Sequence, residues 1–459
     1  MFHRLLIANR GEVAVRIARA CRELGVSPIG VASQVDLRAS WVEVMDEVVC
    51  IGPGAPADSY LRPERIVQAA RQTRASAIHP GWGFLAENPA FAALCRQHGI
   101  TFVGPAPELM AKMGLKSPAK AAMRAAGLPV IPGSVGSLAD AGEATRVAGE
   151  VGYPVLLKAD AGGGGRGMRL CHDEAEVRGA FGQAQAEALS SFGSAAIYIE
   201  KFLTGGRHIE VQVLADTFGN ALHLGERDCS VQRRHQKLIE ESPSPALGAA
   251  ERFELGALAS AAAERVGYVG AGTIEFLRSP DTAEERGRLY FMEMNTRLQV
   301  EHPVSELVTG VDIAAWQIRI AAGQSIDFDQ DDIAFRGHSV EARINAENCE
   351  ADFRPTPGRL SRFHFDLDAG PGRLRLDTHL AEGDEVPPHY DSLLGKLIAW
   401  GETREEATVT LRAGLEKAEI EGVSTTIPVH RAVLDSANFR SGDYDTSEIP
   451  GWGTLPAAR

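Results

Sequence analysis

The chain has 459 residues, enough for about three domains, and its 44 % hydrophobic and 24 % charged residues are ordinary for a globular protein. Its 61 acidic and 47 basic residues give a formal charge of −14, which argues against a broad nucleic-acid-binding surface but allows a local cationic pocket. Six cysteines form no CxxC pair and no apolar run approaches about 18 residues. We therefore expect reduced thiols, no structural metal, no membrane span and a cytoplasmic location.

The first predicted domain, residues 1–113, opens with a strand, a helix and a strand. Residues 3–9 are mostly apolar, residues 12–25 carry apolar side chains at helical spacing and end on Gly25, and a second apolar run follows. This order indicates a doubly wound α/β sheet of parallel strands. Since the loop NRGE lacks the GxGxxG glycines, we favour a scaffold over a dinucleotide site.

The second predicted unit, residues 114–203, is a connector followed by a glycine-tipped hairpin. In YPVLLKADAGGGGRGMRL, residues 153–170, two strands flank four consecutive glycines, and the first strand carries Lys158. A Walker loop is excluded, because neither its Gly-Lys-Ser/Thr end nor its helix is present. Glycines let backbone N–H groups approach phosphate oxygens, so we interpret the hairpin as a phosphate-covering flap, with a ligand-free surface hairpin as the alternative.

The third predicted unit, residues 204–330, contains strands with one polar face. Residues 226–241 gather basic side chains in an otherwise acidic chain, which indicates an anionic partner, although a solvated loop can also carry such a run. Glu275 lies on a strand 18 residues before Glu293. Two antiparallel strands could therefore bring both carboxylates to one metal ion.

The string FMEMNTRLQVE, residues 291–301, alternates polar and apolar side chains. Its polar face combines a carboxylate and a carboxamide for a hard cation with an arginine and a second carboxylate. A straight strand would place Glu293 and Glu301 roughly 26 Å apart, so we expect a bend within residues 296–299. The alternative is an edge strand whose polar face simply meets water.

Several strings together resemble one known family: EKFL, HIEVQVLAD, RDCSVQRRHQK, GAGTIEF, EMNTRLQVEHPVSE, EARINAE and HYDSLLGKLI. In this order, and over nearly the whole chain, they are similar to the biotin carboxylases of the ATP-grasp superfamily. The resemblance implies an α/β (α+β) ATP-grasp fold. It has a Rossmann-like N-terminal domain, a glycine-rich lid lobe, a catalytic core, a C-terminal mixed α/β domain at residues 331–446 and a tail at 447–459.

The family resemblance also implies an activity. It is the ATP- and bicarbonate-dependent carboxylation of biotin through carboxyphosphate, which is the first half-reaction of an acyl-CoA carboxylase. Biotin would arrive on a biotin carboxyl carrier protein and leave for a carboxyltransferase subunit. Both would be separate chains or missing parts, since no acceptor of the AMKM type occurs here. The enzyme would be a homodimer that binds neither nucleic acid nor membrane.

Site residues carried over from the family fall into four groups. ATP would be bound by Lys116, Lys158, Gly164, Gly165, Glu200, Lys201, Phe202, Leu203, His208, Gln232, His235, Glu275 and Glu293. Mg²⁺ or Mn²⁺ would be held by Glu275, Glu293 and Asn295. Bicarbonate would be seated by Lys237, Arg297, Gln299, Val300 and Glu301. The catalytic residues would be Glu301 as general base, Arg297, Lys237, and Arg343, which would also bind biotin and stabilise its enolate-like oxygen.

The chain departs from the family pattern at three positions. Trp82 stands where many relatives have tyrosine, and Asp160 and Ala161 replace a serine and a fifth glycine, which predicts a slightly stiffer flap. Two other functions stay open. One is an ATP-grasp ligase that joins a carboxylate to an amine, and the other is a catalytically silent nucleotide-binding subunit. The final acceptor, an acyl-CoA or a keto acid such as pyruvate, also stays open.

Overall fold

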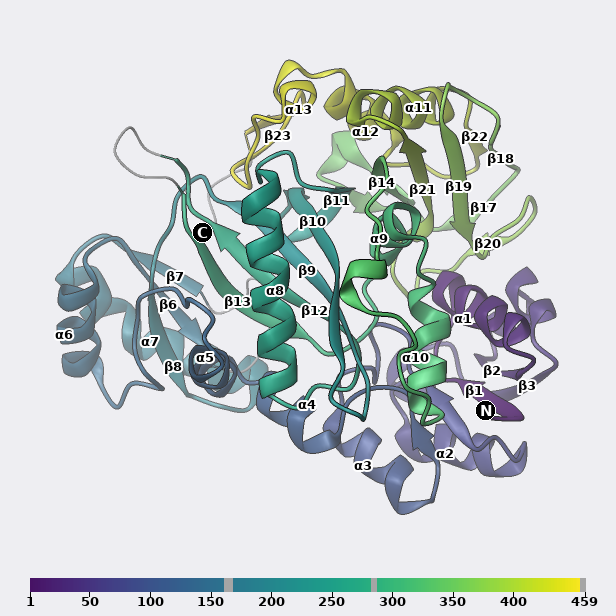
Figure 1. Ribbon diagram of the computed structural model, residues 1–459, viewed down its shortest axis with the longest axis horizontal. Coiled ribbons are helices and arrows are strands. Elements are labelled where there is room, and N and C mark those ends of the chain that lie inside the picture. Colours follow the sequence, from purple (N-terminus) through teal and green to yellow (C-terminus); the bar gives the residue numbers. More distant parts are fainter. Residues whose placement is uncertain (161–167, 282–286, 455–459) are drawn as a thin grey trace.

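A computed structural model describes residues 1–160, 168–281 and 287–454 of the chain. Its three larger sheets have five, eight and three strands. In Figure 1 the three-stranded lobe projects to the left, the five-stranded N-terminal sheet lies at the lower right, and the C-terminal helices lie at the top. The eight-stranded sheet occupies the centre and joins these parts.

The N-terminal sheet is parallel, with the strand order β3-β2-β1-β4-β5 of a doubly wound fold, as predicted. The helix after the first strand ends one residue before Leu24, and Gly25 follows with a φ of +68°, a conformation that glycine adopts without strain. The elements are β1 Arg4–Ile7, α1 Gly11–Glu23, β2 Ser27–Ser33, β3 Glu47–Gly52, α2 Pro63–Gln72, β4 Ala77–His79, α3 Pro89–Gln97, β5 Thr101–Phe102 and α4 Pro107–Met113.

The lid lobe is a small antiparallel sheet covered by two helices. Its elements are α5 Lys116–Ala125, α6 Ala141–Val151, β6 Val155–Ala159, β7 Met168–Cys171, α7 Glu174–Phe192 and β8 Ile197–Lys201. Strands β6 and β7 form the predicted hairpin, with Lys158 opposite Met168. Apolar side chains of β6 and β8 pack with those of α6 and α7 in one core. The predicted phosphate-binding Gly164 and Gly165 lie outside the described residues, as does Ala161.

The central sheet has the order β13-β12-β9-β10-β11-β14-β21-β19, and all its neighbouring strands are antiparallel. Its elements and covering helices are β9 Arg207–Ala215, β10 Ala221–Arg233, β11 Gln236–Ser242, α8 Ala249–Arg265, β12 Gly270–Arg278, β13 Leu289–Asn295, α9 His302–Thr309, α10 Ile313–Ala321, β14 His338–Asn345, β19 Arg373–Thr378, β21 Leu393–Gly401, α11 Arg404–Glu416, α12 Ile427–Asp435 and α13 Ala437–Ser441.

Short strands complete the C-terminal part: β15 Glu347–Asn348, β16 Arg354–Pro355, β17 Gly358–Arg359, β18 Arg362–His364, β20 Glu385–Val386, β22 Glu419–Glu421, β23 Glu448–Ile449 and β24 Gly453–Thr454. The central sheet runs across the predicted boundary at residue 330, because β11 pairs with β14. The predicted catalytic core and the C-terminal domain therefore share a sheet. The exact domain limits at residues 113, 203, 330 and 446 stay predictions.

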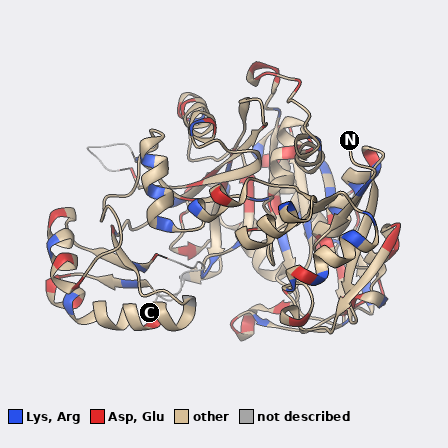
Figure 2. Cartoon of the chain, turned by 90° about the horizontal axis from the view of Figure 1, so that it is seen from below, with Lys and Arg blue, Asp and Glu red and all other residues tan. Residues whose placement is uncertain are grey.

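The two faces of the central sheet differ in chemistry. Along β9 the odd-numbered residues from Ile209 to Ala215 pack in one apolar core with α8, which crosses the sheet in Figure 1. The even-numbered His208, Glu210 and Gln212 alternate with them and are also buried. In Figure 2 acidic and basic residues lie side by side within the central strands. Among the described residues, no helix combines the length and apolar character that a membrane span needs.

Candidate active site

The register of two strands places the two acidic residues that were predicted to hold a metal ion opposite each other. Glu275 of β12 faces Glu293 of β13, because these strands pair antiparallel. Nδ2 of Asn295 donates to Oε1 of Glu275 over 2.8 Å, and Nζ of Lys116 lies 2.9 Å from Oε2 of Glu293. Two carboxylates and an amide oxygen suit Mg²⁺ or Mn²⁺, so the donor set fits the predicted ion.

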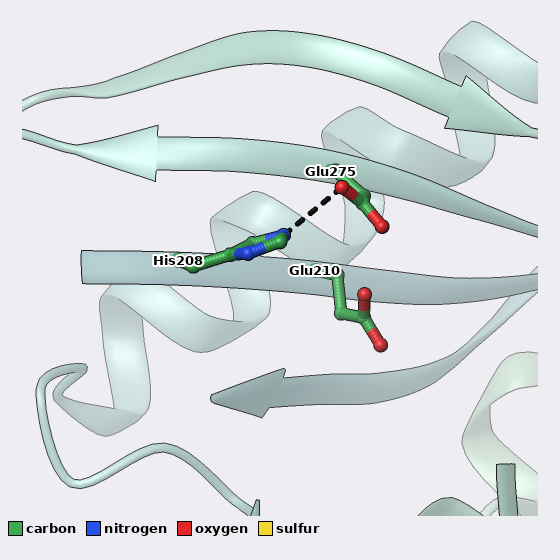
Figure 3. Close-up of side chains that lie close together, drawn as sticks. All are labelled: His208, Glu210 and Glu275. Atoms are coloured by element: carbon green, nitrogen blue, oxygen red, sulfur yellow. Dashed lines mark hydrogen bonds and ion pairs between the residues drawn. The ribbon is translucent and has the colours of Figure 1, made fainter. Parts of the chain in front are cut away.

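His208 joins this group from β9. Its Nε2 lies 3.0 Å from Oε2 of Glu275, and Figure 3 shows Glu210 beside the pair. The ligand atoms of the three residues all lie within 4.8 Å of one another. Burial raises the pKa of Glu275, but the charges of Lys237 and His208 outweigh burial and hold that pKa far below its ordinary value. Glu275 is therefore ionised at neutral pH.

Lys237 is the cationic centre of the site. Its Nζ lies 2.6 Å from Glu210, 3.2 Å from Glu275 and 2.5 Å from Glu301. Burial lowers the pKa of Lys237, but the surrounding acidic groups raise it well above its ordinary value. A permanently charged ammonium group in this position can hold a small anion.

Glu301 ends the predicted bend. Strand β13 stops at Asn295, and Glu301 directly precedes α9, so the chain turns between them as expected. The Glu301 side chain is fully buried, with Oε1 against Lys237 and Oε2 2.7 Å from Nη2 of Arg343. Burial raises the pKa of Glu301, but Lys237 and Arg343 outweigh burial and hold the pKa well below its ordinary value. Glu301 is thus ionised at neutral pH.

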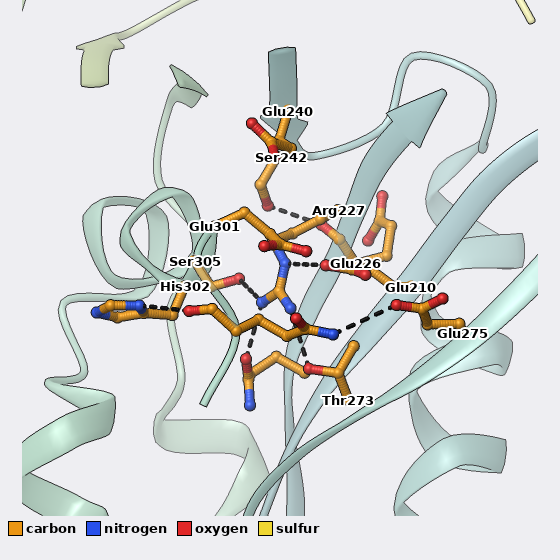
Figure 4. A network of polar contacts seen from close by, with 12 residues as sticks. Glu210, Glu226, Arg227, Glu240, Ser242, Thr273, Glu275, Glu301, His302 and Ser305 are labelled. Atoms are coloured by element: carbon orange, nitrogen blue, oxygen red, sulfur yellow. Dashed lines mark hydrogen bonds and ion pairs between the residues drawn. The ribbon is translucent and has the colours of Figure 1, made fainter. Parts of the chain in front are cut away.

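Two further buried residues support this centre, and neither was singled out from the sequence. Nε of Arg343 donates to Oε1 of Glu240 over 2.6 Å. Arg227 lies within the network of Figure 4, where its Nε is 2.5 Å from Glu210 and its Nη1 is 3.1 Å from Oγ of Ser305 on α9. Arg227 opens the string RDCSVQRRHQK, whose resemblance to the family was the only feature of the sequence that pointed to it.

Arg297 connects the remaining polar residues of the bend. Nη1 of Arg297 lies 2.8 Å from Oε1 of Gln299, and Nη2 lies 3.1 Å from Oδ1 of Asn295. Nε of Arg297 also lies 2.8 Å from Oε2 of Glu87, which comes from the N-terminal domain. Val300 follows in the turn, with its side chain nearly buried. Glu87 and Trp82 both belong to the string AIHPGWGFLAENP, which runs from β4 to the start of α3.

The lid residues form a separate buried group. Glu200 of β8 binds Nζ of Lys158 and Nζ of Lys120, each over 2.6 Å. Burial raises the pKa of Glu200, but the two lysines outweigh burial and lower it to about 2. Nζ of Lys201 donates to the carbonyl oxygen of Tyr153 over 2.7 Å. The predicted adenine-lining residues Phe202 and Leu203 follow, where the chain leaves the lid.

A tight hairpin turn carries the two predicted ribose contacts. Gln232 lies near the end of β10, and His235 lies in the two-residue turn that leads to β11. Arg234 and His235 have φ values of +48° and +67°, a left-handed conformation that non-glycine residues rarely adopt. Arg233 and Arg234 both form ion pairs with Asp352, so part of the predicted basic cluster is already neutralised.

Models of known families match most of the chain. They are described as the biotin carboxylase N-terminal domain at residues 1–110, the carbamoyl-phosphate synthase L chain ATP binding domain at 116–328, and the biotin carboxylase C-terminal domain at 341–450.

The chain belongs to the biotin carboxylase family. The biotin carboxylase of Nostoc is 51 % identical to it over 98 % of both chains. A solved complex of the Campylobacter jejuni biotin carboxylase with beta-gamma-ATP is 45 % identical, with a TM-score of 0.92, and the match covers 97 % of this chain and 98 % of that one. The biotin carboxylase domain dimer of Hydrogenobacter thermophilus 2-oxoglutarate carboxylase, solved with MgADP, ADP and bicarbonate, is 48 % identical, with a TM-score of 0.91 and 97 % and 96 % coverage. The predicted ATP-grasp fold of a biotin carboxylase is thereby confirmed.

Proposed function

We propose that this chain is the biotin carboxylase component of a biotin-dependent carboxylase, and that it uses ATP and bicarbonate to carboxylate the ureido nitrogen of biotin. One structural observation supports the proposal in addition to the family assignment. The fully buried carboxylate of Glu301 is held between Lys237 and Arg343, close to the facing pair Glu275 and Glu293. A base, an anion site and a metal site would therefore lie side by side, since Lys237 also contacts Glu275 over 3.2 Å.

The nucleotide would lie between the lid and the central sheet. Lys116, Lys158 and His208 would bind its phosphates, residues 200–203 would line the adenine, and Gln232 and His235 would contact the ribose. A divalent ion held by Glu275, Glu293 and Asn295 would neutralise charge on the phosphoryl oxygens. The ion pairs of Lys116 with Glu293 and of Lys158 with Glu200 would then rearrange, since each lysine now rests on a carboxylate.

Bicarbonate would lie against Lys237, Arg297, Gln299 and the Val300 backbone. Glu301 takes its proton, and the resulting oxyanion attacks the γ-phosphorus, which breaks the bond to ADP and gives carboxyphosphate. Carboxyphosphate then divides into CO₂ and phosphate within the closed site. That phosphate takes the proton of the ureido N–H of biotin, and the nitrogen then attacks CO₂ while Arg343 holds the enolate-like oxygen.

The partners of this reaction follow from the same proposal. The enzyme would work as a homodimer in the cytoplasm. A carrier protein would present biotin to it, and a separate carboxyltransferase would then receive the carboxylated biotin. The six unpaired cysteines agree with a reducing compartment. The carboxyl group would pass to an acyl-CoA or to a keto acid such as pyruvate or 2-oxoglutarate. Family membership disfavours the alternative of a different ATP-grasp ligase.

The test is ATP hydrolysis by the purified chain with Mg²⁺, bicarbonate and free biotin. We expect hydrolysis that needs bicarbonate, rises with biotin and nearly disappears in Glu301→Gln, since the amide cannot accept the proton. A wild-type chain that binds ATP but responds to neither biotin nor bicarbonate would instead support the silent subunit. Exposed Glu254 on α8 offers the matched control, because Glu254→Gln changes the same charge away from the proposed site.

A further inference from the structure

A fully buried lysine lies directly behind the turn that carries the proposed base. Lys396 belongs to β21, within the apolar string LLGKLIAW, and its side chain has no exposed surface. Its Nζ donates to the carbonyl oxygen of Val300 over 2.8 Å. The same Nζ lies 3.1 Å from Oε1 of Glu12 on α1 and 3.8 Å from Oδ2 of Asp377 on β19.

Lys396 keeps its charge in this position. Burial lowers the pKa of Lys396, but Glu12, Glu341 and Asp377 outweigh burial and raise it above its ordinary value. A charged lysine without contact to water is costly to bury, and buried ion pairs often stabilise a fold no better than apolar groups of the same size. Packing alone therefore gives little reason for an ammonium group here.

The contact with Val300 explains why an ammonium group is buried at this position. Two successive carbonyl groups of the turn are held from behind by fully buried side chains. Nδ1 of His302 lies 2.8 Å from the Gln299 oxygen, and Lys396 binds the Val300 oxygen. Since a carbonyl oxygen only accepts, Nδ1 of His302 carries a proton. These contacts fix the planes of the peptide groups just before Glu301.

The peptide plane that Lys396 holds ends at the Cα atom of Glu301. From the front, Lys237 and Arg343 hold the Glu301 carboxylate. Rotation of this peptide would move both the backbone of Val300 and the base relative to bicarbonate. A shift of about 1 Å in such a group can lower a rate by about 100-fold.

We propose that Lys396 is a positioning residue, which orients the Val300–Glu301 peptide so that the base and the backbone meet bicarbonate in a reactive arrangement. The inference rests on the proposed function. It ties the reaction to three parts of the chain, because Lys396 comes from the C-terminal part, Glu12 from the N-terminal domain and Val300 from the catalytic core. Lys396 does not touch the proposed nucleotide contacts, so its loss should affect bicarbonate and not ATP.

The test compares Lys396→Met with wild type. Methionine is an unbranched side chain one atom shorter than lysine, and it removes the donor and the charge. We expect kcat/KM for bicarbonate to fall on the order of 100-fold, with the KM for ATP within about twofold of wild type. Bicarbonate should raise the melting temperature of the wild-type chain but not of the variant, whereas ADP with Mg²⁺ should raise both.

A second variant covers the case in which Lys396→Met does not fold because Glu12 is left without its partner. Lys396→Met with Glu12→Gln removes both charges, and Asp377 keeps its 2.7 Å contact with Arg375. Lys417→Met is the matched control, because this exposed lysine pairs with Asp366 over 2.8 Å. It should leave all parameters unchanged.

Two results would overturn the inference. One is a folded variant whose KM for ATP rises as much as its KM for bicarbonate. The other is a loss of activity fully explained by a smaller folded fraction, as expected of a purely structural ion pair. Absence of bicarbonate-dependent turnover in the wild type would contradict the proposed function itself. The bicarbonate-induced change in melting temperature still reports on Lys396 in that event.

Discussion

Nη2 of Arg343 lies 2.7 Å from Oε2 of Glu301, so the proposed biotin-binding residue and the proposed base are in direct contact. Their charges are coupled. Once Glu301 takes a proton from bicarbonate it loses its negative charge, and its hold on Arg343 weakens. The guanidinium then becomes available to the oxygen of biotin at the stage when CO₂ forms. Through this contact, deprotonation of bicarbonate by Glu301 would precede the binding of the biotin oxygen by Arg343 in the proposed reaction.

Arg343→Met should separate these halves. We expect biotin-dependent carboxylation to fall by about 100-fold or more, since an oxyanion donor is lost, while binding of ADP with Mg²⁺ stays near the wild-type value. Carboxylated free biotin, measured with labelled bicarbonate, checks the first expectation and calorimetry the second. Arg362→Met, at an exposed arginine that pairs with Glu419 over 2.7 Å, serves as control. Equal losses in both variants would count against a role for Arg343 in biotin binding.

Glu275→Gln tests the metal site. The change removes one of the two facing carboxylates, so Mn²⁺ binding in the presence of ADP should weaken by about tenfold or more. Titration of free Mn²⁺ by electron paramagnetic resonance measures this affinity. Removal of divalent ions with a chelator should abolish ATP hydrolysis by the wild type, and Mg²⁺ should restore it. Unchanged Mn²⁺ affinity in Glu275→Gln would place the ion elsewhere.

The proposed metal site could be predicted from the sequence because strand periodicity is local. A period of two residues places Glu293 and Asn295 on one face, and the length of an extended chain requires a bend before Glu301. The pairing of Glu275 with Glu293 followed from two neighbouring strands. The roles of Lys237 and Arg343 came from family strings and not from periodicity.

Other residues of the site could not be found this way. Lys396 stands in a string that is otherwise typical of a buried strand, and its partners Glu12 and Val300 lie far from it in the sequence. Glu87 reaches Arg297 from another domain. Such contacts depend on how distant strands pair, as in the β11–β14 pairing that extends the central sheet across residue 330. Local patterns carry no information on that pairing.

Asp160, which replaces a serine of the family pattern, should support both the stability of the fold and the binding of ATP. It follows β6, at the base of the flap, and its Oδ1 accepts the backbone N–H of Ser117 over 2.8 Å. Its carbonyl oxygen accepts the N–H of Lys116 over 3.2 Å. Asp160 thus caps the helix that begins with a proposed phosphate ligand. Asp160→Ala should lower stability by about 1 kcal/mol and raise the KM for ATP several-fold.

Asp140→Ala is a closely matched control for this change. Oδ1 of Asp140 accepts the backbone N–H of Glu143 over 2.9 Å and caps α6 in the same lobe. We expect a similar loss of stability in thermal unfolding but no change in the KM for ATP. If both variants raise that KM equally, the effect belongs to the stability of the lid lobe and not to the position of Lys116.

Glu241, which lies outside the proposed active site, should make the stability of the fold depend on pH. Its Oε2 lies 2.7 Å from Nε2 of His338 and 2.7 Å from Nε of Arg404, and the side chain is buried. Burial raises the pKa of Glu241, but the bonds from His338 and Arg404 outweigh burial and lower it to about 2. A carboxyl group whose pKa is lower in the folded state than in the unfolded state stabilises the fold above the unfolded pKa of about 4.5.

That stabilisation is lost as the pH falls from about 4.5 through about 2. Glu241→Gln should therefore lower the free energy of unfolding by about 3 kcal/mol at pH 7, from the size of the pKa shift. The difference from wild type should shrink below pH 4.5 and vanish near pH 2. Urea unfolding at pH 7, 4.5 and 3 measures it, with the exposed Glu421→Gln as control. A difference that stays constant over this range would mean that Glu241 contributes through packing and not through its charge.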